Sequence, residues 1–226
     1  MYKIKGRQLV KTSGSLIPQQ LQDGFIGLTK PLIKILVKLG IHPNAITVMG
    51  VIIAAFAALI FLAGHLRIGG LLVLLGGLCD AVDGTLARSS NKVTRFGAMF
   101  DSTVDRYAEF IIFFGIAAHF VLNKDYLSSV AIFLALCGSL MVSYTRARAE
   151  GLGFEASVGL MQRPERIIFI GLGALIHPVA LKLAVWLVAL LANFTAAQRI
   201  VYVYRQDLKE LEKNASPGSH IENTKA

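Results

Sequence analysis

The sequence predicts an all-α integral membrane protein with six transmembrane helices preceded by an interfacial amphipathic helix. Of its 226 residues, 54% are apolar and only 16% are charged, whereas a soluble domain carries about 25% charged residues. The apolar residues gather in blocks close to the length of about 20 residues that crosses a hydrocarbon core. Residues 1–11 are polar and basic with no apolar stretch after them, so no secretory signal peptide is expected.

A basic amphipathic helix is expected before the first span, within a cytoplasmic N-terminal segment formed by residues 1–40. Thr29 is expected to cap this helix and Gly40 to end it. Lysines recur there at four-residue intervals and form a stripe on one face: Lys30, Lys34 and Lys38. A helix of this kind lies in the headgroup plane, with its lysines near anionic lipid. The alternative is an ordinary amphipathic helix packed against the spans.

The six-span domain is expected over residues 41–204, and a polar cytoplasmic tail over residues 205–226. The predicted spans cover residues 44–63, 68–87, 96–122, 127–148, 164–176 and 178–204. The fifth span is short, and its boundary with the sixth is expected near His177 and Pro178. In the tail, a short helix is expected to precede a disordered end.

Basic residues predict the orientation of the spans. Arg88, Lys92 and Arg95 lie in the loop between spans two and three, whereas the opposite loops hold only a few scattered cations. Because positively charged loops stay in the cytoplasm, both termini and the site described next are expected on the cytoplasmic side of the cell membrane. The net charge of +9 fits that membrane face, and nothing in the sequence resembles a nucleic-acid reader.

Four aspartates lie in or at the ends of spans two and three: Asp80, Asp83, Asp101 and Asp105. An ionised carboxylate at membrane depth costs at least about 2.5 kcal/mol and by default indicates function. The first two are three residues apart and the last two are four apart, so each pair shares one helix face. Like charges that converge in this way need cations between them. All-oxygen ligands favour two ions of Mg²⁺ or Mn²⁺ over zinc.

Small and basic residues accompany the aspartates. Gly84 and Gly97 let a nucleotide or a neighbouring backbone come close, and packing between membrane helices is their alternative role. Arg88 stands about two turns beyond Asp80, where it can reach a phosphate. Its alternative role is that of an orientation-setting loop charge.

The residues from Asp80 to Asp105 read D-x-x-D-G-x-x-A-R-x8-G-x-x-x-D-x-x-x-D. This string resembles the signature of the CDP-alcohol phosphotransferase family at all eight positions. The resemblance implies a homodimeric magnesium-dependent transferase of phospholipid biosynthesis that moves a phosphatidyl group from CDP-diacylglycerol to a small alcohol. It implies that all four aspartates bind metal and that Asp105 is also the general base. It further implies a CDP-lipid site made of Asn44, Ala45, Ile46, Thr47, Gly84, Arg88, Thr94 and Gly97.

The acceptor is expected to carry a phosphate, because polar and basic residues gather around the link between spans four and five: Ser143, Arg146, Arg148, Arg163 and Arg166. Pro164 suits the first turn of a helix, and a helix N-terminus attracts anions. The strings around these residues resemble the phosphatidylinositol phosphate synthase branch, which implies inositol phosphate as acceptor. The alternatives are glycerol phosphate as acceptor, or arginines that only hold the cytoplasmic face.

Two other classes of protein are alternatives to this enzyme. An ion-coupled transporter also carries intramembrane carboxylates, although the sequence shows no inverted repeat. A non-catalytic member of the family would have lost one of the aspartates or Arg88, and this chain retains them all. Glu109, one turn after Asp105, is expected to support the site from behind.

Overall fold

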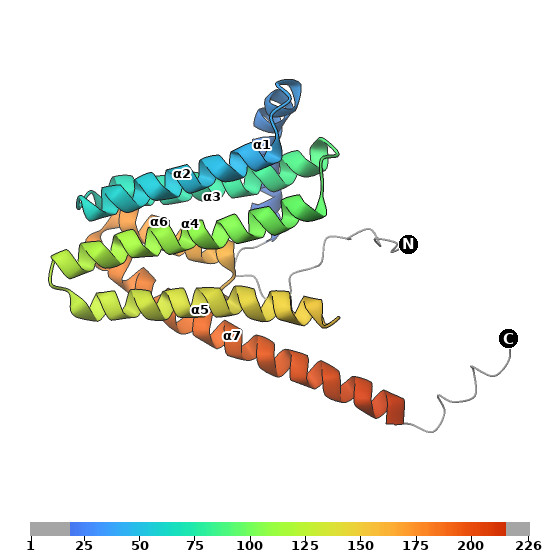
Figure 1. Ribbon diagram of the computed structural model, residues 1–226. Coiled ribbons are helices and arrows are strands. Elements are labelled where there is room, and N and C mark those ends of the chain that lie inside the picture. The colour runs from blue at the N-terminus through green and yellow to red at the C-terminus, as the bar shows by residue number, and fades with distance from the viewer. Residues whose placement is uncertain (1–18, 216–226) are drawn as a thin grey trace.

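The structure, a computed structural model, describes residues 19–215 and the side chains of residues 29–212, and this part is helical with no strands. Its seven helices are α1 (Gln19–Lys38), α2 (Pro43–Leu62), α3 (Leu66–Ser89), α4 (Arg95–Leu122), α5 (Tyr126–Gly151), α6 (Arg163–Ile176) and α7 (Pro178–Ala215) (Figure 1). Each of the six predicted spans falls on one helix from α2 to α7 and begins within two residues of the predicted start. The prediction of an all-α protein is therefore confirmed for the described residues.

Among the described residues, four helices are long and apolar enough to cross a membrane: α2, α3, α5 and α7. α6 and α4 do not meet these criteria, for two different reasons. α6 has 14 residues and is about 21 Å long at 1.5 Å per residue, which is shorter than a hydrocarbon core. α4 has 28 residues, but Asp101, Asp105, Arg106 and Glu109 place four charged groups in its first 15 residues. The chain is therefore an all-α membrane protein with several apolar helices.

The helices from α2 to α7 form a closed ring. α2 contacts α3 and α4, α4 contacts α5, α5 contacts α7, and α6 lies between α7 and α3. α1 contacts α3 and lies steeply across one end of the bundle (Figure 1). Because consecutive helices run in opposite directions, the end of α3 and the starts of α2, α4 and α6 meet at the same end of the ring. This is the end that carries the aspartate motif.

The ends of two helices differ from the sequence prediction. α1 begins at Gln19 and carries Pro31 within it, so the prediction that Thr29 caps this helix was wrong. The prediction assumed that Pro31 lies in the first turn of the helix. In the structure Pro31 lies inside the helix, where proline has no N–H to donate and one backbone hydrogen bond is missing. Gly40 adopts a φ of +69° directly after the helix, as a C-terminal glycine does. Residues 205–215 continue α7 without a break, and residues 216–226 lie outside the described residues.

An ion pair joins two helices at the end of the bundle opposite the motif. The Asp125 side chain accepts a hydrogen bond from the Ser128 N–H and so caps α5. Lys182 near the start of α7 lies 2.6 Å from the same carboxylate. The hydrogen bond from the Lys182 ammonium lowers the pKa of Asp125. This contact fixes α7 against α5 far from the aspartates.

Small residues bring the helices of the ring close together. A Cβ placed on Gly115 of α4 would lie 2.5 Å from the Cα of Ala58 on α2. A Cβ on Gly70 of α3 would lie 2.6 Å from the Gly171 carbonyl oxygen on α6. In membrane proteins such small residues let backbones pack directly, because lipid supplies no hydrophobic drive between helices. These two contacts bring α4 close to α2 and α3 close to α6.

We expect Gly115→Ala to lower the free energy of unfolding by about 1–3 kcal/mol, because the added methyl group must push α4 away from α2. Unfolding of purified protein in mixed micelles, titrated with a denaturing detergent, measures this. Gly151→Ala is the matched control, since no atom lies within 4 Å of a Cβ placed there. Equal stability of the two variants would contradict the close packing of α2 and α4.

Candidate functional site

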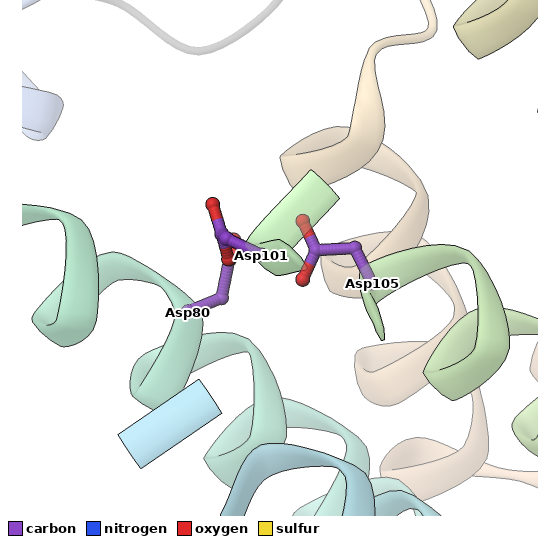
Figure 2. A group of neighbouring side chains, drawn as sticks. All are labelled: Asp80, Asp101 and Asp105. Carbon is purple, nitrogen blue, oxygen red and sulfur yellow. The ribbon is translucent and has the colours of Figure 1, made fainter. Parts of the chain in front are cut away.

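Three aspartates from two helices form a cluster. Asp80 lies on α3, and Asp101 and Asp105 lie one turn apart on α4. One carboxylate oxygen from each lies within 4.8 Å of the other two, and the side chains point toward one another (Figure 2). The four-residue spacing on α4 puts both of its carboxylates on one helix face, the face that turns toward Asp80.

Asp83, the fourth aspartate of the motif, lies outside this cluster. Its side chain is buried, and its Oδ2 accepts a hydrogen bond of 2.7 Å from the Thr47 hydroxyl on α2. The Thr47 hydroxyl is also 3.4 Å from the Pro43 carbonyl oxygen. The hydroxyl of Thr47, a residue expected at the CDP-lipid site, thus orients Asp83.

Arg163, the first residue of α6, reaches into the aspartate cluster. Its Nη1 lies 2.5 Å from Asp80 Oδ1 and 2.6 Å from Asp105 Oδ2. Arg106 on α4 adds a more distant charge, with its Nη1 at 3.9 Å from Asp105 Oδ2. One guanidinium therefore bridges the carboxylates of two different helices.

The donor set suits a hard divalent cation. Asp101 Oδ1 is buried and, within the described part of the chain, has no hydrogen-bond partner. A buried carboxylate oxygen without a partner is unfavourable, and it faces two further carboxylates. Oxygen ligands in a tight group are those that Mg²⁺ and Mn²⁺ prefer. Asp80, Asp101 and Asp105 therefore fit a divalent metal ion.

A second, fully buried ion pair lies beside the cluster. Arg166 on α6 donates from Nε to Glu109 Oε1 at 2.6 Å and from Nη2 to Glu109 Oε2 at 2.9 Å. Its Nη1 donates to the Met161 carbonyl oxygen at 3.2 Å. Arg166 was predicted to bind the acceptor phosphate; in the structure its guanidinium has these partners and lines the cleft beside the aspartates.

A narrow cleft runs from the aspartates into the ring. Its polar lining comes from residues of four helices: Thr47, Asp80, Asp83, Asp105, Glu109, Arg163 and Arg166. Deeper in the bundle the lining is apolar and includes Val73, Ile112 and Ile170. The charged groups thus lie at one end of the cleft, above the apolar interior.

Several of the predicted CDP-lipid residues lie at the starts of α2 and α4 and at the end of α3. The Thr94 hydroxyl accepts a hydrogen bond from the Gly97 N–H and caps α4. A Cβ on Gly97 would lie 2.9 Å from that hydroxyl and 3.7 Å from Asn44 Oδ1, so the starts of α2 and α4 are neighbours. Arg88 is exposed at the end of α3 and donates to the Thr85 hydroxyl at 3.1 Å. Its guanidinium lies 3.6 Å from where a Cβ of Gly84 would stand.

The other residues of that set are placed differently. Ala45 is exposed and Ile46 is buried, where it packs with Ile33, Val82 and Leu86. Ile46 therefore contributes to the packing of α1, α2 and α3, and its side chain is not open to a ligand.

The structure does not bring the five predicted acceptor residues together. Only Arg163 reaches the aspartates. Arg146 pairs with Glu150 at 2.9 Å on the surface of α5, and Arg148 is exposed. Ser143 lines a separate groove between α4 and α5 with Arg106 and Tyr144.

Arg106 and Arg199 belong to the site region, although no role was predicted for either. The Arg199 side chain is buried in α7 and donates to the carbonyl oxygens of Val158 and Val142 at 2.8 and 2.5 Å. It thereby holds the segment between α5 and α6 that leads to Arg163. The signal was present in the sequence, since Arg199 is a charge within the apolar span predicted at 178–204 and lies far from Lys182, the other charge of that span.

The chain is similar in sequence to enzymes of inositol lipid synthesis. It is 40% identical over 168 residues to archaetidylinositol phosphate synthase of Pyrococcus horikoshii, an alignment that covers 74% of this chain and 86% of that protein. It is 36% identical over 187 residues to phosphatidylinositol phosphate synthase of Mycobacteroides abscessus, with 79% of this chain and 84% of that protein covered.

Solved structures of phosphatidylinositol phosphate synthase from Mycobacterium tuberculosis share the fold at 32% sequence identity. The complex with CDP-DAG superposes with a TM-score of 0.71 and covers 78% of this chain and 93% of that chain. The complex with manganese and citrate gives a TM-score of 0.72 and covers 78% and 88%. Residues 40–202 also match the family model described as CDP-alcohol phosphatidyltransferase. With its complete aspartate motif and this match over most of its length, the chain belongs to the CDP-alcohol phosphatidyltransferase family.

Proposed function

We propose that this enzyme transfers a phosphatidyl group from CDP-diacylglycerol to inositol phosphate and releases CMP. The observation that carries the proposal is the convergence of Asp80, Asp101 and Asp105 from a motif with all eight family positions present. The similar enzymes are named for two different lipid backbones, archaetidyl and phosphatidyl. Inositol phosphate is the part that their names share, so the similarity supports this acceptor over others.

In the proposed reaction, Asp105 takes the proton of the acceptor hydroxyl. That oxygen then attacks the lipid-side phosphorus of the donor, the bond from this phosphorus to the oxygen of the CMP group breaks, and CMP leaves. Asp80, Asp83, Asp101 and Asp105 would hold two Mg²⁺ or Mn²⁺ ions. When bound, these ions neutralise the pyrophosphate and polarise the phosphorus under attack.

We place the CDP group of the donor at the starts of α2 and α4. Two neighbouring helix N-termini attract a pyrophosphate through their free N–H groups. Thr94, Gly97 and Asn44 lie there, and Arg88 at the end of α3 adds a positive charge. We place the acceptor phosphate near Arg163 and Arg166 on α6, with Ser143, Arg146 and Arg148 on the side of α5.

We further propose that α2 to α7 make six membrane crossings, with both termini and the aspartate site on the cytoplasmic side of the cell membrane. The basic loops support this orientation. Residues 41–204 would then form the catalytic domain, in a homodimer, and residues 205–226 a cytoplasmic tail. On α1, Lys34 and Ile35 are exposed while Ile33 is buried against α3, which supports an interfacial position for this helix.

Glycerol phosphate is the second candidate acceptor, because an arginine beside the aspartates serves any phosphorylated alcohol. An ion-coupled transporter is the candidate of a different class. It would need an ion gradient, whereas the enzyme releases CMP in detergent, where no gradient exists.

We expect purified protein in detergent, given CDP-diacylglycerol and Mg²⁺, to release CMP with inositol phosphate and not with glycerol 3-phosphate, free inositol or serine. Chromatographic measurement of CMP and identification of the lipid product test this. CMP release with glycerol 3-phosphate alone would keep the reaction and replace the acceptor. No release with any acceptor would contradict the proposed function.

We expect Asp105→Asn to lower kcat roughly 10²- to 10⁴-fold, the range that a lost general base gives, while CDP-diacylglycerol binding is largely retained. Asp125→Asn is the matched control, because it makes the same change at the opposite end of the bundle and keeps a capping side chain. Rates of CMP release and titrations of the lipid donor measure both. Near-normal turnover of Asp105→Asn would show that another group accepts the proton.

We expect EDTA to abolish CMP release and Mg²⁺ or Mn²⁺ to restore it, because the carboxylates need cations to bind a pyrophosphate. Electron paramagnetic resonance titration with Mn²⁺ should find two ions per chain, and Asp101→Asn should weaken their binding. One ion per chain would contradict the two-ion arrangement. Undiminished activity after chelation would contradict metal dependence altogether.

A further inference from the structure

α1 has one apolar face that is buried and another that is exposed. Ile33 is 4% exposed and packs with apolar residues of two other helices, Ile46 of α2 and Val82 and Leu86 of α3. Beside this face, three large apolar side chains are 43%, 55% and 68% exposed: Leu32, Ile35 and Leu39. Because α1 lies steeply across one end of the bundle (Figure 1), the surface layer of a bilayer that the other helices cross can cover this second face.

A basic face lies on the far side of the exposed apolar face. Lys30, Lys34 and Lys38 recur every four residues and are all exposed, so they fall on one side of the helix. At 3.6 residues per turn, that side is about 130° around the helix from the exposed apolar face. From Thr29 to Lys38 the sequence holds no carboxylate, and Asp23, the nearest on this helix, precedes Lys30 by seven residues. This face of α1 is therefore positively charged.

The positive charge continues onto the neighbouring loop. Lys92, between α3 and α4, donates from its ammonium to the Gly40 carbonyl oxygen at 3.5 Å, so it lies beside the end of α1. Arg88 is exposed at the end of α3. Residues 84–100, which include both cations, hold no aspartate or glutamate. The end of the bundle around α1 thus carries positive charge on the helix and on the loop next to it.

We propose that the basic face of α1, formed by Lys30, Lys34 and Lys38, binds the phosphate groups of anionic phospholipids at the membrane surface. A lysine near such a surface contributes about 1 kcal/mol of attraction, which is roughly 5-fold in an equilibrium constant. The exposed apolar face then lies among acyl chains while the lysines stay at the headgroups, as in other interfacial helices. A nucleic acid or an acidic protein would match the charge but leave the apolar face uncovered.

The lipid site adjoins the place where the donor is bound. Ile33 packs on Ile46 and Val82, and the residues that follow these two, Thr47 and Asp83, are joined by a hydrogen bond. α1 therefore supports the part of α2 and α3 that faces the donor. The donor is itself an anionic lipid because of its pyrophosphate, so the basic face raises its local concentration beside the cleft. This consequence rests on the proposed function, whereas the lipid site does not.

Spin-labelled lipids test the site without catalysis. The protein is reconstituted in phosphatidylcholine vesicles with a trace of spin-labelled phosphatidylglycerol or phosphatidylcholine, and electron paramagnetic resonance measures the fraction of label whose motion is restricted. One triple variant combines Lys30→Gln, Lys34→Gln and Lys38→Gln, and a second places Lys→Arg changes at the same positions and keeps the charge. The control, Arg67→Gln with Lys124→Gln, removes two exposed cations at the opposite end of the bundle. Melting temperatures check that each variant folds.

We expect the wild type to restrict phosphatidylglycerol more than phosphatidylcholine, and the glutamine variant to lose most of this difference. The arginine variant and the control should keep it. In vesicles with little CDP-diacylglycerol, the glutamine variant should raise the KM for this donor about 5-fold or more and leave kcat unchanged. At 1 M salt, where charges are screened beyond about 3 Å, wild type and variant should behave alike.

An unchanged preference for phosphatidylglycerol in the glutamine variant would overturn the lipid site, as would an equal loss in the control. A lost preference with an unchanged donor KM would overturn the consequence for the donor. Failure of the wild type to release CMP would overturn the proposed function instead, and the spin-label measurement would still decide whether α1 binds anionic lipid.

Discussion

The repulsion among the clustered aspartates is the constraint on which the rest of the structure depends. Three carboxylates with oxygens within 4.8 Å of one another cannot remain charged inside a helical bundle unless positive charge lies among them. The protein brings part of that charge itself, through Arg163 at the tip of α6. A divalent cation, which these oxygen ligands suit, would supply the remainder. The carboxylates that repel one another in the bundle are thus the same groups that suit a metal ion.

The closed ring of helices is held by two kinds of contact, which lie in different parts of the bundle. Within the apolar part, glycine and alanine bring backbones together, as Gly115 and Ala58 do between α2 and α4. At the motif end, charged side chains make the links, and each link joins two helices that are distant in sequence. α6 is the helix in which both kinds of contact meet. With 14 residues it is shorter than the other helices of the ring, and it carries Arg163 and Arg166 to the aspartates.

Sequence spacing does not decide which arginines meet the acceptor, because arginine side chains are long and can reach many partners. Five polar and basic residues close in sequence were expected to bind one phosphate. In the structure Arg146 pairs with Glu150, Arg166 pairs with Glu109, and only Arg163 faces the aspartates. The similarity to enzymes named for inositol phosphate synthesis therefore supports the acceptor more strongly than the positions of these arginines do.

The sequence by itself predicted the helices and the three aspartates that cluster, because both follow from local spacing, whereas Asp83, predicted with them, pairs with Thr47. Apolar blocks of a length fixed by the bilayer predicted the starts of α2 to α7, and carboxylates three or four residues apart predicted shared helix faces. The tertiary structure alone decided which partners those residues meet. It turned Thr47 toward Asp83, paired Arg166 with Glu109, and used Arg199 to hold the segment before α6. Such contacts join residues that are 36 to 57 positions apart, and no local pattern encodes which of several arginines will reach a given carboxylate once the helices have packed.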